Sequence, residues 1–144
     1  MPLFLLPILS GLIAQALKPL INKSWYDSLS NDGRKIPRYG GMPSAHTAFA
    51  ISLATLVAFT DGFVTTSFAI TISLVIFILD DALRMRIFLS RHGEALHKLI
   101  KQLPANKQDQ FPRLESRLGH KPAEVIAGGL LGFVITIIIL LLIP

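Results

Sequence analysis

Residues 122–144 have the sequence PAEVIAGGLLGFVITIIILLLIP, in which no charged residue follows Glu124. A helix needs roughly 20 mostly apolar residues, about 17–25, to cross the hydrocarbon core of a bilayer. The segment meets that length, and Pro122 suits the first position of a helix, where a missing N–H costs nothing. We therefore predict a membrane-spanning helix over residues 122–143.

Three more apolar segments precede it, at residues 3–21, 43–60 and 64–81. The first contains Lys18 near its end, but a lysine there can extend its ammonium to the membrane surface. The chain is 51% hydrophobic and 16% charged, with a mean hydropathy of +0.56, which excludes an ordinary soluble protein. The 144 residues are predicted to form a single all-α domain, an integral membrane helical bundle with about four transmembrane helices.

The basic residues indicate how such a bundle is oriented. All 14 lysines and arginines lie at the end of the first predicted helix, in the polar loop 22–42 or in the polar loop 82–121. Four spans place both loops on one face, and the positive-inside rule makes that face cytoplasmic. The expected location is the inner (plasma) membrane, with any site in these loops facing the cytoplasm.

The formal net charge of +5 also restricts the partners. A basic face beside a bilayer suits anionic lipid head groups and phosphates, so membrane lipids are expected partners and nucleic acid is not. The chain has no cysteine, which excludes disulfides, thiolate catalysis and cysteine-based metal sites.

The segment Gly40–Thr47, with the sequence GGMPSAHT, begins the second predicted helix. Its glycines permit a tight turn and a close backbone approach, and Pro43 suits the first helical position. The amides of that turn, the Ser44 hydroxyl and the helix dipole would together bind an anion beside His46. The same residues are also good capping sequence, so a plain helix start is the alternative interpretation.

A second segment, Ser116–Glu124, precedes and begins the last predicted helix. His120 and Glu124 are four residues apart, so the carboxylate can accept a hydrogen bond from one imidazole nitrogen. That bond fixes the tautomer and leaves the other nitrogen able to attack a substrate. The alternative interpretation is a cap, because a carboxylate near a helix N-terminus is favourable by itself.

The two segments lie on the same predicted face of the membrane, and together they resemble a known superfamily. Pro43-Ser44-Ala45-His46 and His120-x-x-x-Glu124 resemble signatures of the type-2 phosphatidic acid phosphatases and vanadium-dependent haloperoxidases. The closer resemblance is to a small divergent branch, whose motifs occur here in order over nearly the whole chain: Gln15-x-x-Lys18, Gly40–Thr47, Asp81-Ala82 with Arg86, and Gly119–Val125.

The resemblance implies a phosphatidic acid phosphatase-like core and a metal-independent phosphatase acting on a lipid phosphate or diphosphate, with no cofactor. His120 would attack phosphorus and form a phosphohistidine, and Glu124 would orient its ring. His46 would protonate the leaving lipid oxygen, a general acid step typically worth about 10²–10⁴-fold in rate.

The resemblance further implies a phosphate-binding set that stabilises the charge of the transferring group. Its expected members are Lys18, Ser44, Arg86 and the backbone at Gly41. The divergent branch usually has a second arginine where this chain has Ile87, and Arg84 is the expected replacement. Arg117 is a further candidate, since Ser116-Arg117 is similar to a Ser-Arg pair of the superfamily at a different spacing.

Several alternatives stay open at this level. The same anion site would also serve a non-enzymatic lipid-phosphate binding or transport protein, and His46, His120 and Glu124 would suit a metal. Asp80 and Asp81 have either a direct role or a structural one, pairing with Arg84 or Arg86. Residues 128–132 contain a Gly-x-x-x-Gly pattern, which favours close helix packing within the chain or in a homodimer.

Overall fold

The computed structural model of the protein describes residues 2–22, 28–29, 35–36, 40–108, 110–111 and 121–142. Helices make up almost all of this part of the chain, which confirms the all-α class. A pair of two-residue strands, β1 (Ser28–Leu29) and β2 (Lys35–Ile36), runs antiparallel. The helical elements are α1 (Leu5–Ile21), α2 (Ala45–Thr60), α3 (Thr66–Asp80), the π-helix η1 (Asp81–Met85), α4 (Arg86–Lys101), α5 (Ala105–Gln108) and α6 (Pro122–Leu142).

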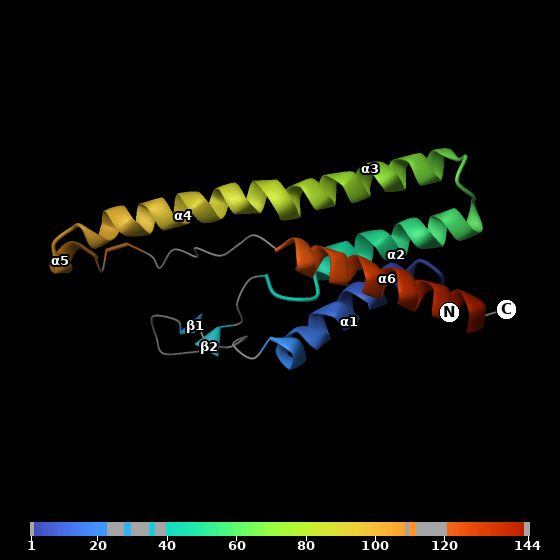
Figure 1. Ribbon diagram of the computed structural model, residues 1–144, viewed down its shortest axis with the longest axis horizontal. Helices are drawn as coiled ribbons and strands as arrows, with labels where there is room; N and C mark the ends of the chain where they lie inside the picture. Colours follow the sequence, from blue (N-terminus) through green and yellow to red (C-terminus); the bar gives the residue numbers. More distant parts are fainter. Residues whose placement is uncertain are drawn as a thin grey trace.

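Helix α2 is the centre of the bundle. It packs against α1, α3 and α6, and α1 also packs against α6. Figure 1 shows both chain termini at one end of the bundle, while α1 and α3 end, and α2 and α6 begin, at the other end. The basic segments that follow α1 and α3 therefore leave the bundle at the same end.

The interior of the bundle is made of small and polar side chains. Ser10, Ser52 and Thr136 are fully buried, and they form a hydrogen-bonded chain across α1, α2 and α6. Ser10 Oγ donates to Ser52 Oγ at 3.1 Å, and Ser52 Oγ lies 2.6 Å from Thr136 Oγ1. Small residues and interhelical hydroxyl bonds are what hold helices together in lipid, where apolar burial gives no driving force.

Large apolar side chains cover the outside instead. They include Ile70, Ile76 and Phe77 on α3 and Ile126, Leu130 and Leu141 on α6, each of them more than half exposed. Such a continuous apolar surface is unfavourable in water. Its natural surroundings are lipid, so the structure confirms an integral membrane helical bundle.

The helix lengths agree with that conclusion for part of the bundle. Helix α6 has 21 residues, which gives about 31 Å at 1.5 Å per residue, close to the thickness of the hydrocarbon core. By length and composition, α6 and the continuous helix Thr66–Lys101 are able to cross a membrane, whereas α1 and α2 have 17 and 16 residues. The predicted helix at residues 43–60 begins two residues late, since Ser44 is its N-cap and Pro43 precedes that cap.

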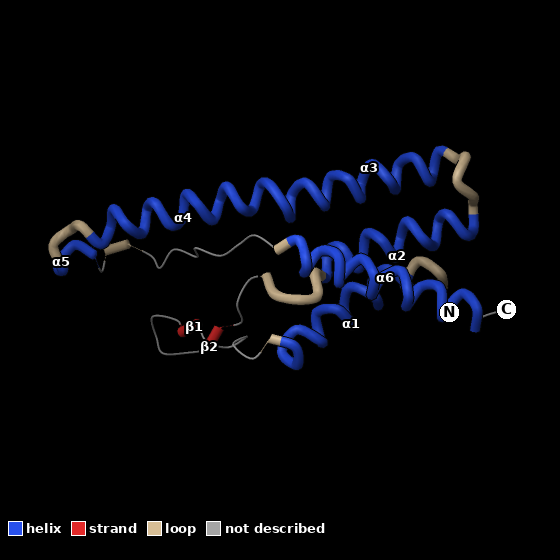
Figure 2. Tube along the Cα trace, viewed as in Figure 1, coloured by secondary structure: helices blue, strands red, loops and turns tan. Residues whose placement is uncertain are grey.

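Residues 82–101, which fall in the predicted polar loop 82–121, are helical. Helix α3 continues through η1 into α4 as one rod of 36 residues, about 54 Å long (Figure 2). No proline interrupts it before Pro104, and polar residues such as Arg91 and Lys98 are compatible with a helix once it has left the lipid. The rod therefore extends well beyond the roughly 30 Å core of a bilayer.

The Gly-x-x-x-Gly pattern of α6 packs within the chain. A Cβ atom at Gly128 would lie 2.3 Å from the carbonyl oxygen of Ser44, and one at Gly132 would lie 2.1 Å from that of Ala48. Both distances are too short for a real contact, so α6 lies against α2 only because these two positions lack a side chain. This contact fixes the two helix starts relative to each other.

Candidate phosphate site

The start of α2 is held by a turn and a buried cap. Gly40 and Gly41 have φ angles of 90° and 82°, a conformation that side chains disfavour. Ser44 then caps the helix: its Oγ accepts from the Thr47 N–H at 3.4 Å and from the Thr47 hydroxyl at 3.0 Å. Ser44 is fully buried. The Ser44 hydroxyl was expected to bind phosphate directly. It instead stabilises the helix turn whose amides would bind the phosphate.

The start of α6 is also capped. Pro122 occupies the first helical position, as predicted, and the N–H of Lys121 donates to Glu124 Oε2 at 3.2 Å. This is the carboxylate half of a capping box. The capping interpretation of Glu124 is therefore correct as far as Oε2 is concerned, and the carboxylate has a second oxygen for another bond.

The two helix starts meet. The N–H of Ser44 donates to the backbone carbonyl of Glu124 at 2.9 Å, next to the close contact of Gly128 with Ser44. Each helix N-terminus carries about half a positive charge on its first amides. Two of them side by side form a region of positive potential, which suits a phosphate.

Lys18, in the last turn of α1, adds a basic side chain to this region. The residue is 5% exposed, and its ammonium interacts electrostatically with two side chains from other elements. The carboxylate of Glu124 attracts it, and the guanidinium of Arg86 repels it. The structure therefore brings Lys18, Arg86 and Glu124 into electrostatic reach of one another, although they are far apart in sequence.

The π-helix η1 places Arg86. The backbone N–H of Arg86 donates to the carbonyl of Asp81, the i→i+5 bond of a π-turn, and Arg86 Nε donates to Asp81 Oδ2 at 2.7 Å. Single π-turns occur often at functional sites. The pairing of Asp81 with Arg86 is thus confirmed. It uses one of the five N–H donors of the guanidinium and fixes the plane of that group.

Arg84 has different surroundings. Its Nη1 lies 3.0 Å from Asp80 Oδ1, in an i, i+4 pair, and its side chain is 72% exposed. Residues two apart on a helix do not share a face. Arg84 and Arg86 therefore point in different directions, and the geometry distinguishes the motif residue Arg86 from Arg84, the expected replacement for a second arginine.

Asn22, which sequence analysis did not select, ties α1 to the glycine turn. Its Nδ2 donates to the carbonyls of Lys18 and Met42, both at 2.8 Å, and its Oδ1 accepts from the Met42 N–H at 3.3 Å. This side chain fixes the distance between Lys18 and the start of α2. An asparagine directly after a helix is a known signal of a helix C-terminus, and this signal could have identified Asn22 from the sequence.

The remaining predicted residues divide into two groups. His46 lies exposed in the first turn of α2, beside the meeting helix starts. His120 and Arg117 lie outside the described residues. Among the described residues, no three histidine, aspartate or glutamate side chains are grouped to hold a metal ion, and the proposed His46–His120–Glu124 metal site extends beyond that part of the chain.

Comparison with known proteins adds the family. The sequence model of the Divergent PAP2 family matches residues 1–135. The chain is also similar to the uncharacterized membrane protein YuiD of Bacillus subtilis (strain 168), with 30% identity over 92% of this chain and 92% of that protein. No solved structure matches this chain.

Proposed function

Because the chain belongs to the Divergent PAP2 family, we propose that it is a membrane phosphatase that hydrolyses a lipid phosphate or diphosphate monoester. The observation that carries the proposal is the convergence of two helix N-termini with two cations. Ser44 and Glu124 join the starts of α2 and α6, and Lys18 lies within electrostatic reach of Arg86. A phosphate between these groups would relieve the repulsion between the two cations and bind to the positive helix ends.

The proposed chemistry uses two histidines and no metal. A nitrogen of His120 attacks phosphorus while the bond to the lipid oxygen breaks, and His46 gives that oxygen a proton. Water then attacks the phosphohistidine and gives a proton to His46, the N–P bond breaks and inorganic phosphate leaves. His46 is exposed in the first turn of α2, where a leaving group could reach it.

Glu124 has two tasks in this scheme. Oε2 caps α6 through the N–H of Lys121, which holds the carboxylate in one orientation. The carboxylate then orients the ring of His120 from a fixed position. Ser44 acts as a positioning residue through its cap, and the amides of the first turn of α2 contact the phosphate.

The proposed location is the inner (plasma) membrane, with the site facing the cytoplasm. The starts of α2 and α6 lie at the end of the bundle from which the rod of α3, η1 and α4 projects (Figure 1). That rod carries Arg91, Lys98 and Lys101 beyond the lipid, and basic residues favour the cytoplasmic side.

A non-enzymatic lipid-phosphate binder or transporter is the second candidate. The capping bond from Lys121 to Glu124 favours it, because a carboxylate with a structural task does not require a catalytic one. Such a protein would use Lys18, Arg86 and the helix starts in the same way, without a nucleophile.

Phosphate release from a panel of lipid phosphates by purified protein in detergent tests the proposal. Turnover should be lost in His120→Ala, while an acid-labile phosphohistidine should be trapped in the wild type. His97→Ala, an exposed histidine on α4, is the matched control and should keep full activity. Binding of a lipid phosphonate without any phosphate release would support the binder instead, and full turnover in His120→Ala would exclude the mechanism.

A further inference from the structure

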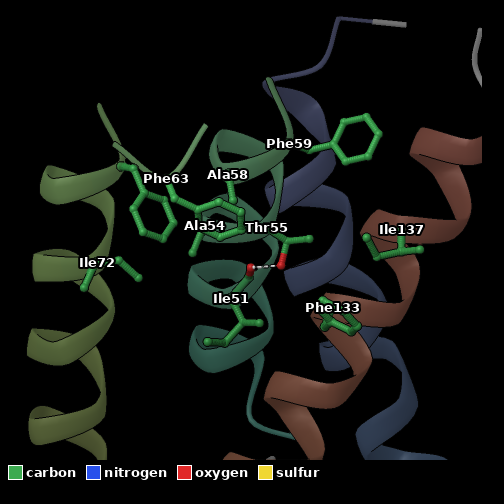
Figure 3. Close-up of a pocket in the computed structure, with 10 residues that line it drawn as sticks. Ile51, Ala54, Thr55, Ala58, Phe59, Phe63, Ile72, Phe133 and Ile137 are labelled. Atoms are coloured by element: carbon green, nitrogen blue, oxygen red, sulfur yellow. Dashed lines mark hydrogen bonds between the residues drawn. The ribbon is translucent and has the colours of Figure 1, made fainter. Parts of the chain in front are cut away.

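An apolar cavity of about 340 Å³ lies between α2, α3 and α6. Figure 3 shows α2 between the other two helices, with α3 on one side and α6 on the other. Ala54 and Ala58, one turn apart on α2, form the floor and leave space above it, because each has only a methyl group. Ile72 of α3 forms one wall, and Phe133 and Ile137 of α6 form the other.

The lining offers almost no polar group. Among the described residues that line the cavity, Thr55 is the one with a hydroxyl, and its Oγ1 donates to the carbonyl of Ile51 at 2.8 Å (Figure 3). A polar ligand would leave its own donors and acceptors unsatisfied here, at a cost of a few kcal/mol each, about 1–3 by mutational data. The occupant of this groove must therefore be a hydrocarbon.

The groove extends from the phosphate site towards the opposite membrane surface. Ile51, at its near end, is seven residues after Ser44 on α2, about 10 Å along the helix axis. At the far end, Phe63 and Phe68 pack edge to face, with ring centroids 5.2 Å apart. Phe63 belongs to the connection between α2 and α3, and Phe68 lies in the first turn of α3. Figure 1 shows this connection at the end opposite the helix starts.

Helices α2 and α6 stay in close contact between the site and the groove. Gly129 of α6 lies against both helix turns that connect them: a Cβ atom there would be 3.7 Å from Thr47 Cγ2 and 3.5 Å from Ile51 Cγ1. Thr47 is the residue that bonds to the Ser44 cap. A lipid chain attached to a phosphate at the helix starts would run along the outside of this α2–α6 contact to reach the groove.

We propose that the groove between α2, α3 and α6 holds one hydrocarbon chain of the lipid whose phosphate binds at the starts of α2 and α6. This inference rests on the proposed function and adds a tail subsite to it. A lipid tail gains little by leaving lipid for an apolar groove, since both surroundings are apolar. The groove therefore aligns the substrate so that its phosphorus faces the attacking nitrogen, and its effect is on the specificity constant.

Photo-crosslinking with hexadecylphosphonate that carries a diazirine near the end of its chain tests the proposal without turnover. The label should appear on the groove residues of α2, α3 and α6. Labelling should fall about tenfold in Lys18→Met and for the matching hexadecanol probe, because the phosphonate holds the chain in register. Equal labelling by both probes, or labels confined to the outer faces of α3 and α6, would overturn the anchored tail.

Ala58→Phe fills the groove, and Ala69→Phe is the matched control, since Ala69 is exposed on α3 and does not line the cavity. Ala58→Phe should lower kcat/KM for hexadecyl phosphate roughly 10- to 100-fold, as misaligned substrates do, and leave a short, soluble phosphate monoester unaffected. Equal values in both variants would refute the tail subsite. Groove labelling in a protein that releases no phosphate would instead refute the phosphatase and retain the subsite.

Discussion

The bundle of α1, α2 and α6 and the rod of α3, η1 and α4 would contribute to the same proposed phosphate site by different physics. In the bundle, glycines and buried hydroxyls hold three helices so closely that two N-termini meet beside Lys18. The rod packs on α2 and extends far beyond the other helices. It delivers a single guanidinium, Arg86, by means of one π-turn. Close backbone contact thus fixes the positions of the helix N-termini in the bundle, whereas an ion pair fixes the position of Arg86 on the rod.

The strongest test of this contrast is the buried cation of the bundle. Lys18→Met should lower lipid phosphate turnover by about 10²–10³-fold, the usual cost of removing a preorganised charge from a transition state. Lys98→Met on the exposed side of α4 is the control and should have no effect. If Lys18→Met retained wild-type turnover and a wild-type melting temperature, the bundle would not contain the phosphate site.

The packing of the bundle should tolerate a methyl group at one glycine and not at the next. Gly132→Ala would bring a Cβ within 2.1 Å of the Ala48 carbonyl oxygen, so the helices must separate, and overpacking of this kind costs about 1–3 kcal/mol. Gly129→Ala meets its nearest neighbour, Ile51, at 3.5 Å and should be neutral. Thermal unfolding in detergent would compare them, and equal stabilities would contradict the close α2–α6 contact.

On the rod, two neighbouring arginines should behave differently. Arg86→Ala removes a half-buried charge near Lys18 and should lower turnover about tenfold, in the range of one charged hydrogen bond. Arg84→Ala removes an exposed pair with Asp80, and such pairs contribute about 0–1 kcal/mol, so its turnover should be nearly unchanged. A larger loss of turnover in Arg84→Ala than in Arg86→Ala would mean that Arg84, and not Arg86, binds the phosphate.

The smallest expected effect is at the connection between the end of α1 and the glycine turn. Asn22→Ala removes the bonds to Met42 and should cost about 0.5–1.5 kcal/mol of stability. It should also raise KM for the lipid phosphate more than it lowers kcat, because Lys18 then holds its distance from α2 less well. Asn22→Asp, which keeps the acceptor for the Met42 N–H, should lie between the alanine variant and the wild type.

The amino-acid sequence was sufficient for the features that depend on local composition. Apolar runs predict helices in lipid because a bilayer leaves backbone groups no other partner, and this determined the all-α membrane bundle. The Pro-Ser-x-His and His-x-x-x-Glu motifs resemble those of a known family, and the family model confirms that prediction. Pro122 at the first position of α6 belongs to the same class of local signal.

The tertiary structure decided what depends on contacts between distant residues. It made Ser44 a buried cap rather than an exposed ligand, directed Gly128 and Gly132 toward α2, and separated Arg86 from Arg84 by a π-turn. It also extended α3 through the first half of a predicted loop and formed an apolar groove beside α2. Local patterns specify which surfaces a helix has, but the partner of each surface depends on how closely the backbones can approach, which only the assembled bundle determines.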